Sequence, residues 1–457
     1  MANVTLIGAG SSAFSMSLLR DICLKPSLAD STLTLVDIDE RRLNTAAALT
    51  ERYSREVKSS LRSRAFTDRR KALEGADFVI CAVKVGGYGP LECERELAGQ
   101  HGYYRGIGDR VSCYYGGVGA YHQLAFFERL AKDMEELCPE AWLIQTANPV
   151  FEGTNYITRH TKVKAVGVCH GHLAYRRIAE RLKLDLGRVS VQMAGFNHCI
   201  WLKDFRYEGH DAYPLLDDWI RDESKAYWES DRYEARVNEI LAFSDDQMSP
   251  GAIDAYRLNG LMPIGDTVRS ASPWWHHTDL QAKEKWYGPG GGFDSEIGWS
   301  SYLREKDAIQ AKSLALSTSI GSLLPEYPPV PSGEQHIEIV DAIANDKEAC
   351  LQLNIPNRDA VEGLPDDVLV EVPVLAGARG LQAIHVGSLP ANLMNNVMIP
   401  RMLNMERILD AYVSGSREGL VLWLMNDPRT RSYEQAKGLI DSLLALPWNA
   451  KAGEHYR

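Results

Sequence analysis

The chain has 457 residues, with 50 Lys and Arg against 61 Asp and Glu, which gives a formal charge of −11. This acidic balance excludes a nucleic-acid scaffold and a polybasic membrane-surface protein, because both need a basic face. Hydrophobic residues make up 45% and charged residues 24%, as in ordinary soluble proteins. A chain of this length folds without disulfides or structural metals, and it favours two or three domains.

Short apolar strands alternate with helices in the first half of the chain. The predicted strands cover residues 4–7, 33–36, 78–83, 142–146 and 163–168. Helical patterns reach Ile22 after the first strand and cover 40–57 and 120–137. Such strands are typical of a parallel sheet with helices on both faces, so we expect a Rossmann-type α/β fold.

From about residue 195 this rhythm is lost. The second half is richer in Trp, Tyr, Pro and Gly and contains irregular stretches such as 287–292. We expect a Rossmann domain over residues 1–195 and a mixed α+β domain over 196–457.

The sequence also predicts where the protein resides. No stretch of about 18 uninterrupted apolar residues is present, so no transmembrane helix is expected. The first residues lack the basic start and long apolar core of a signal peptide. The eight cysteines have neither a disulfide-framework spacing nor a CxxC motif. We therefore expect a cytoplasmic protein with no nucleic-acid or membrane partner.

A glycine-rich turn, Gly8-x-Gly10-x-x-Ala13, joins the first strand to the first helix. Glycines there allow the backbone to approach a pyrophosphate closely, and the helix N-terminus stabilises it. Asp37 ends the second strand, where a carboxylate binds the ribose of NAD and repels the 2′-phosphate of NADP. An ordinary turn is the alternative. The predicted NAD contacts are Gly8, Gly10, Ser11, Ala13, Phe14, Asp37 and Asp39.

Cysteine and histidine residues are concentrated in two later segments. Cys169-His170-Gly171-His172 follows the strand at 163–168, and Asn197-His198-Cys199 comes further along. The carboxyl ends of parallel strands are where such sheets bind ligands. A thiolate and an imidazole from the two segments can form a divalent metal site with open positions. Taken alone, Cys169 is more often a structural residue.

Eleven stretches of the chain, in order and over nearly its whole length, resemble glycoside hydrolase family 4, the NAD- and divalent-metal-dependent glycosidases. The stretches are Gly8–Phe14, Leu35–Glu40, Gly102–Gly106, Thr146–Gly153, Cys169–His172, Ala194–Trp201, Asp246–Arg269, Lys285–Gly288 with Ser295–Trp299, Ser332–Ala342 and Asp427–Thr430. The pattern is most similar to the α-glucosidase subgroup, which shares Cys-His-Gly-His and Pro-Ile-Gly-Asp-Thr-Val-Arg.

The resemblance implies a redox-neutral hydrolysis of α-glucosides. In this family NAD⁺ oxidises the sugar at C3, and a base removes the acidified C2 proton. The aglycone then leaves from C1, water adds, and the hydride returns. The resemblance implies Cys169 and His198 as ligands of Mn²⁺ or another divalent cation, which polarises the C3 carbonyl. It also implies a homodimer or homotetramer, with substrate, metal and subunit contacts in residues 196–457.

Asp266 matches the C2 base of the α-glucosidase subgroup. Without the resemblance it would be interpreted as a turn or helix-cap residue. His170 follows the metal cysteine, where it can contact the sugar or assist the leaving group, and the alternative is a structural histidine. His172 can do similar work, with less support.

Other residues match secondary positions of the family pattern. Asn148 matches a residue that contacts the sugar beside the nicotinamide, and its alternative role is to hold a strand-end turn. Asn197 is expected to orient His198 or a substrate hydroxyl. The aromatic run 274–277 is interpreted as core or subunit interface, with sugar stacking as the alternative. We expect an architectural role for Glu334-Gln335-His336.

One position departs from the α-glucosidase pattern. That pattern has a sugar-contacting Asp where this chain has Cys113, and Arg110 lies in the shorter preceding loop. Loss of a carboxylate suits an anionic sugar, so an α-glucuronide or α-galacturonide is an alternative substrate, although Arg110 can equally be a solvated loop charge. A malate- or lactate-type dehydrogenase and a silent NAD-binding regulator are alternatives from other classes.

Overall fold

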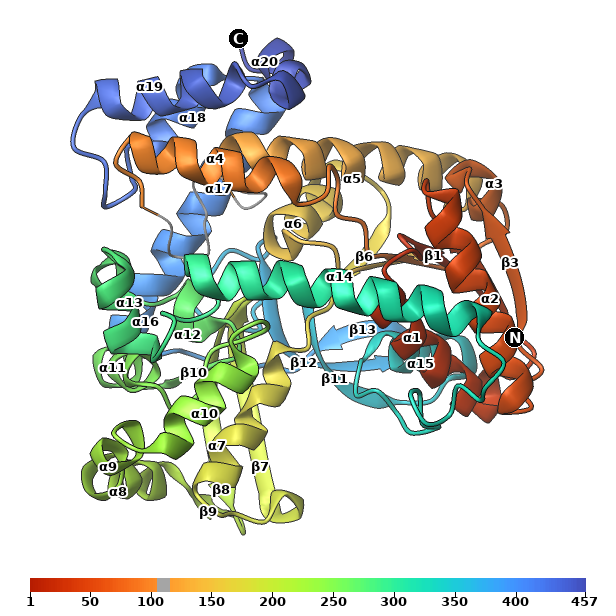
Figure 1. Cartoon of the computed structure of the whole chain (residues 1–457), viewed down its shortest axis with the longest axis horizontal. Helices are drawn as coiled ribbons and strands as arrows, with labels where there is room; N and C mark the ends of the chain where they lie inside the picture. The colour runs from red at the N-terminus through yellow and green to blue at the C-terminus, as the bar shows by residue number, and fades with distance from the viewer. Residues whose placement is uncertain (105–115) are drawn as a thin grey trace.

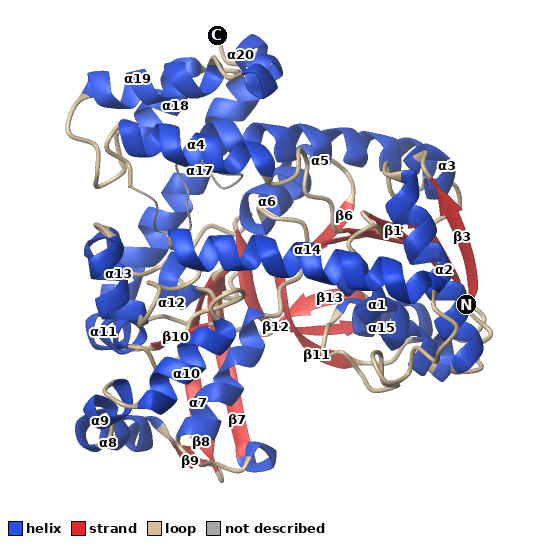
Figure 2. Cartoon of the chain, viewed as in Figure 1, coloured by secondary structure: helices blue, strands red, loops and turns tan. Residues whose placement is uncertain are grey.

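The computed structural model describes residues 1–104 and 116–457, and a long mixed sheet runs through the molecule (Figure 2). Its strand order is β10-β8-β7-β12-β11-β6-β5-β4-β1-β2-β3, with β9 paired to β8 and β13 paired to β12. The strands are β1 (Asn3–Ile7), β2 (Thr32–Val36), β3 (Arg62–Phe66), β4 (Phe78–Cys81), β5 (Trp142–Gln145), β6 (Lys164–Gly167), β7 (Val189–Phe196), β8 (Cys199–Tyr207), β9 (His210–Asp211), β10 (Met262–Ile264), β11 (Ala349–Pro356), β12 (Leu369–Gly377) and β13 (Gly380–Ala383).

Strands β1 to β6 are mutually parallel in the order β3-β2-β1-β4-β5-β6, which is the arrangement of dinucleotide-binding Rossmann folds. This confirms the predicted fold class. The predicted strands correspond to β1, β2, β4, β5 and β6, although β4 ends at Cys81 rather than at Val83. Strand β3 was not predicted, because its residues are mostly exposed at the sheet edge and form no apolar run.

Helices cover both faces of the parallel strands. In Figure 1, α1, α2 and α14 lie on one side, and α5 and α6 with α17 lie on the other. The helices are α1 (Ser12–Leu24), α2 (Glu40–Glu56), α3 (Arg69–Leu73), α4 (Gly89–Gln100), α5 (Gly117–Leu137), α6 (Val150–His160), α7 (Tyr175–Arg181), α8 (Tyr213–Asp222), α9 (Ser224–Trp228), α10 (Asp231–Ile240), α11 (Pro250–Asn259), α12 (Thr267–Ser270), α13 (Leu280–Tyr287), α14 (Glu296–Thr318), α15 (His336–Asn345), α16 (Ala391–Leu393), α17 (Ile399–Ser414), α18 (Arg417–Leu424), α19 (Tyr433–Leu444) and α20 (Ala450–His455).

Antiparallel strands extend the sheet beyond β6. Strands β11 and β12 pair along their whole length, whereas β6 meets β11 only at Gly167–Asn354 and β12 meets β7 only at Glu371–Gly195. Asn354 and Glu371 are also register partners. We call Gly167, Asn354, Glu371 and Gly195 the junction row. The predicted domain boundary at residue 195 falls inside β7, and the sheet continues on both sides of it. The boundary therefore stays a prediction.

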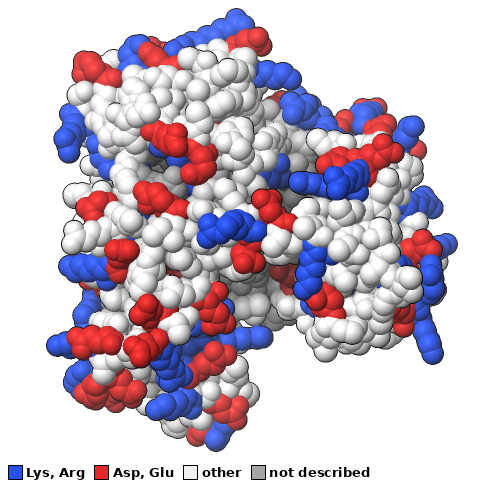
Figure 3. All heavy atoms as spheres, viewed as in Figure 1, with Lys and Arg blue, Asp and Glu red and all other residues white. Residues whose placement is uncertain are grey.

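The apolar core fills the space between the sheet and its helices, and a second cluster lies where α8 to α11 pack on β7, β8 and β10. Basic and acidic side chains are mixed over the face shown in Figure 3. None of the described helices combines the length and the apolar character needed to cross a bilayer. In the aromatic run, Trp274 and Trp275 are each 45% exposed, whereas His276 and His277 are buried.

Candidate active site

The glycine-rich turn after β1 forms a cradle that side chains would close. Gly8 has φ +93°, and a Cβ there would lie 2.9 Å from the backbone of Ala82. A Cβ on Gly10 would lie 2.5 Å from Asp37 Oδ2. Ser11 precedes α1, whose first turn contains no acidic residue. The free N–H groups of that turn suit an anion such as a pyrophosphate.

Asp37 and Asp39 differ in what they do at the end of β2. Asp37 accepts hydrogen bonds from the N–H of Gly10 (2.8 Å) and of Asp39 (2.9 Å), so its carboxylate lies at the cradle. Asp39 caps α2 by accepting from the N–H of Arg42. Phe14 packs its ring edge-on against His336, with 5.1 Å between centroids. The side chain of Ala13 lies outside the described part, and the NAD-contact roles stay predictions.

The loop after β6 carries Cys169 and is packed tightly. His172 Nδ1 lies 3.2 Å from the carbonyl oxygen of Cys169, which ties the loop to itself. A Cβ on Gly265 would lie 2.7 Å from the carbonyl oxygen of Gly171, so this loop rests directly on the one that precedes Asp266. Burial raises the pKa of the Cys169 thiol. A bound cation is what favours the thiolate in such surroundings.

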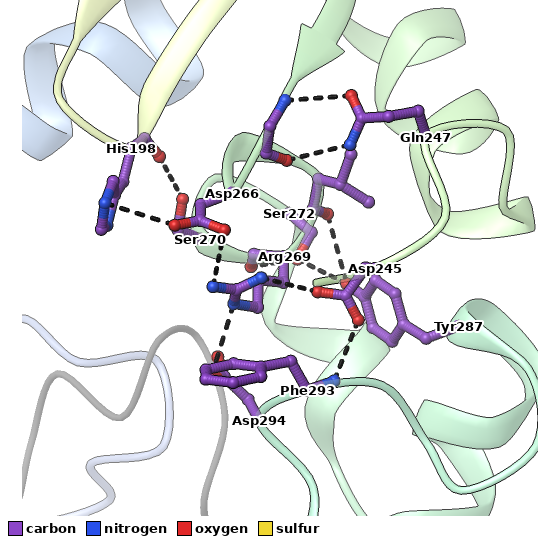
Figure 4. A network of polar contacts seen from close by, with 12 residues as sticks. His198, Asp245, Gln247, Asp266, Arg269, Ser270, Ser272, Tyr287, Phe293 and Asp294 are labelled. Carbon is purple, nitrogen blue, oxygen red and sulfur yellow. Dashed lines mark hydrogen bonds and ion pairs between the residues drawn. The ribbon is translucent and has the colours of Figure 1, made fainter. Parts of the chain in front are cut away.

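His198 occupies the turn of the β7–β8 hairpin, with φ +56°. Its Nε2 lies 3.2 Å from Asp266 Oδ2 (Figure 4). The hydroxyl of Ser270 donates to the carbonyl oxygen of His198, and Thr267 Oγ1 accepts from the N–H of Ile200 at 2.8 Å. Helix α12 is therefore fastened to the hairpin, which brings the predicted base and the predicted metal ligand together.

A buried arginine that was not predicted as a site residue binds Asp266. Arg269 binds Asp266 Oδ1 at 2.7 Å and Asp245 Oδ2 at 2.8 Å, and its Nε lies 3.5 Å from Asp294 Oδ1 (Figure 4). Burial alone would raise the pKa of Asp266, but Arg269 and His198 outweigh it and lower that pKa to about 2. Asp266 stands at the start of α12 without capping it, and it is a carboxylate.

The segment 334–336 reaches the site as well. Glu334 Oε1 lies 3.3 Å from Nδ1 of His170, whose side chain is 73% exposed, and Glu334 Oε2 lies 3.5 Å from Nδ1 of the buried His336. Gln335 exchanges two hydrogen bonds with the backbone of Gln352. The expected architectural role therefore describes Gln335, whereas Glu334 contacts a predicted site residue. Nothing in its sequence surroundings indicated this pairing.

The two predicted asparagines have different surroundings. Asn148 follows β5, and its buried Oδ1 has no hydrogen-bond partner among the described residues, so that oxygen does not hold the turn. Asn197 is buried and donates to Glu371 Oε2 at 3.5 Å. Burial raises the pKa of Glu371 to about 8. Cys113 and Arg110 lie outside the described residues.

These pieces meet at the edge where the parallel strands end. The cradle follows β1, Asn148 follows β5 and Cys169 follows β6, while the β7–β8 turn contributes His198. In the described part of the chain, no group of three or more His, Cys, Asp and Glu residues is arranged to hold a metal ion. A sulfur and an imidazole nitrogen would thus leave most coordination positions open for a substrate.

Known proteins resemble this chain over nearly its whole length. The sequence model described as family 4 glycosyl hydrolase matches residues 3–184, and that of the family 4 C-terminal domain matches 193–430. Similar curated proteins are an α-galactosidase of Bacillus subtilis (24% identity, covering 96% of both chains), an α-galacturonidase of Thermoanaerobacter italicus (25%, 96% of this chain and 95% of that one) and an α-glucosidase of Erwinia rhapontici (27%, 97% and 98%).

Two solved structures share the fold over the whole chain. The Bacillus subtilis protein lplD is 22% identical with a TM-score of 0.81, and the two chains are covered to 97% and 100%. A 6-phospho-α-glucosidase from gut microorganisms, solved with NAD and Mn²⁺, is 16% identical with a TM-score of 0.74 and 97% coverage of both chains.

Proposed function

The chain belongs to family 4 of the glycosyl hydrolases, and from this premise we propose that it hydrolyses α-glycosides with NAD⁺ and a divalent cation. The observation that carries the proposal is that the glycine cradle and the group Cys169, His198 and Asp266 share one sheet edge. A dehydrogenase for hydroxy acids, or a silent nucleotide-binding regulator, would leave that group without a task.

The residues present fit both cofactors. The space beside Gly8 and Gly10 is kept by the absence of side chains, and a thiol with an imidazole suits a borderline cation such as Mn²⁺. The 6-phospho-α-glucosidase of similar fold contains both groups. When bound, NAD⁺ supplies a hydride acceptor for sugar C3, and the cation polarises the resulting carbonyl.

The proposed site residues then have distinct tasks. Asp266 accepts the C2 proton, and Arg269 keeps its carboxylate oriented. Because its pKa is lowered to about 2, Asp266 is a weak base that needs a carbon acidified by a neighbouring carbonyl. Asn148 contacts the sugar beside the nicotinamide. His170, on the exposed side, contacts the sugar or the leaving group.

We propose an α-glucoside as substrate, with an α-uronide as the second candidate. The Pro263–Arg269 segment, which resembles the α-glucosidase subgroup, favours the first, as does the α-glucosidase relative at 27% identity. Cys113 in place of the subgroup's Asp, together with the α-galacturonidase relative at 25% identity, favours the second.

The test is hydrolysis of 4-nitrophenyl α-glucoside, α-galactoside, α-glucuronide and α-galacturonide with NAD⁺, Mn²⁺ and reductant, each then omitted. We expect glucoside turnover that stops without Mn²⁺ or NAD⁺, and a sugar product labelled at C2 in D₂O. Turnover of the uronides alone would favour the second candidate. Activity that survives complete removal of NAD⁺ from the purified protein would contradict the mechanism.

A further inference from the structure

A buried carboxyl lies in the middle of the junction row. Glu371 on β12 is 1% exposed, and Asn354 beside it on β11 is fully buried. The outer members of the row are both glycines: a Cβ on Gly167 would lie 2.9 Å from Asn354 Cβ, and one on Gly195 would lie 2.0 Å from the carbonyl oxygen of Cys199. The side chain of Asn354 thus occupies space that Gly167 leaves open, whereas Gly195 permits the tight backbone approach within the β7–β8 hairpin.

Hydrogen bonds connect the carboxyl with both segments that carry the predicted metal ligands, directly with the one before His198 and through Asn354 with the one before Cys169. Glu371 Oε2 accepts from Asn354 Nδ2 at 3.1 Å and from Asn197 Nδ2 at 3.5 Å. Asn354 Nδ2 also donates to the carbonyl oxygen of Gly167 at 3.3 Å. Cys169 comes two residues after Gly167, and Asn197 directly precedes His198. One carboxyl therefore connects the end of β6 with the β7–β8 turn.

Sheet stability does not explain this arrangement. A buried carboxyl costs free energy unless its oxygens are paired, and an apolar side chain would serve the strand better. Glu371 Oε1 has no hydrogen-bond partner among the described residues. A cation bound at Cys169 and His198 would provide the missing positive charge.

We propose that Glu371 is a positioning residue for the divalent cation, which fixes the spacing of Cys169 and His198 through Asn354 and Asn197 and is ionised behind them when the cation is bound. The inference rests on the proposed function, because it assumes a cation at these two ligands. Carboxyl groups behind metal ligands commonly change metal affinity by about 10- to 100-fold.

The test is a titration of the full chain with Mn²⁺ in the presence of NAD⁺. The electron paramagnetic resonance signal of free Mn²⁺ measures how much of the cation is bound. We expect Glu371→Gln, which keeps the shape and removes the charge, to weaken Mn²⁺ binding by about 10- to 100-fold while NAD⁺ affinity is unchanged. Glu94→Gln is the matched control, since Glu94 on α4 is also buried and accepts from Trp448 and Asn449. It should bind Mn²⁺ like the wild type.

A second pair of variants keeps the test interpretable if E371Q misfolds. Asn197→Asp removes the donor and should also weaken Mn²⁺ binding, whereas the double variant N197D/E371Q restores a donor–acceptor pair and should recover most of the affinity. Unchanged Mn²⁺ binding in E371Q would overturn the inference, as would an equal loss of Mn²⁺ and NAD⁺ affinity with a lower melting temperature. If the wild type binds no Mn²⁺ at all, the proposed function itself fails.

Discussion

The glycine cradle and the proposed cation end, which comprises Cys169, His198, Asp266 and Glu371, are built in opposite ways, although they share one edge of the sheet. The cradle consists of backbone groups and one carboxylate within residues 8–39, so its geometry is local. The cation end consists of side chains from the loop after β6, the β7–β8 turn, the start of α12 and β12, and Asn197 and Glu371 are 174 positions apart. Each can therefore be altered separately.

The largest expected effect comes from Cys169→Ser. A neutral hydroxyl is a poor substitute for a thiolate ligand, so Mn²⁺ binding and hydrolysis should fall below detection. NAD⁺ binding should remain as in the wild type, since the cradle is untouched. The measurements are Mn²⁺ binding, NAD⁺ titration and glycoside turnover, with the exposed Cys350→Ser as control. Full activity of the variant would remove Cys169 from the site.

Asp266→Asn separates proton transfer from binding. The amide keeps the shape but cannot accept the C2 proton, so kcat should fall by about 10²- to 10⁴-fold while NAD⁺ binding persists. Deuterium incorporation at C2 of the product should disappear in parallel with turnover. Asp217→Asn, at an exposed carboxylate that binds Tyr256, should retain both. Undiminished C2 exchange in the Asp266 variant would assign the base to another group.

Asp37→Asn should affect the cradle alone. The amide cannot accept at both oxygens, so the contacts to Gly10 and to a bound ribose weaken. Losing hydrogen bonds to a charged group costs about 1.5–3 kcal/mol, and NAD⁺ affinity should fall by roughly 10- to 100-fold. Isothermal titration with NAD⁺ and with Mn²⁺ separates the two ends. A matching loss of Mn²⁺ affinity would show that they are not independent.

The smallest expected effect is on the pH dependence of stability. It concerns His277, which is buried near Arg269. Burial lowers the pKa of His277 well below 6.5, so the folded chain holds it neutral while the unfolded chain protonates it. The contribution of His277 to stability is fully present above about pH 6.5. As the pH decreases further, the free energy of unfolding decreases by at most about 1.4 kcal/mol per pH unit.

Urea unfolding at about pH 7.5 and about pH 5.5 measures this loss. His277→Gln should lose less stability between the two than the wild type. The exposed His210→Gln is the matched control and should follow the wild type. Identical pH dependence in all three proteins would contradict the role of His277.

The sequence predicts what local patterns encode. The buried strands β1, β2, β4, β5 and β6 each form an apolar run, and the glycine turn has a fixed spacing. The edge strand β3 has no such run, because solvent rather than the core surrounds it. Arg269 lies only three residues after Asp266, so an ion pair between the two could have been predicted from their spacing. Glu334 and Glu371 could not have been predicted in this way, since the first contacts His170 from a loop before α15 and the second is brought to the site by the register of an antiparallel sheet.

The close contact between two loops also bears on directed evolution of this chain toward new sugars. Gly265 has φ +63°, and a Cβ there would lie 2.7 Å from the carbonyl oxygen of Gly171, so any larger residue pushes the Asp266 loop away from the Cys169 loop. His170, between Cys169 and Gly171, has a 73% exposed side chain. A mutant library should therefore keep position 265 as glycine and randomise position 170, where new side chains have room.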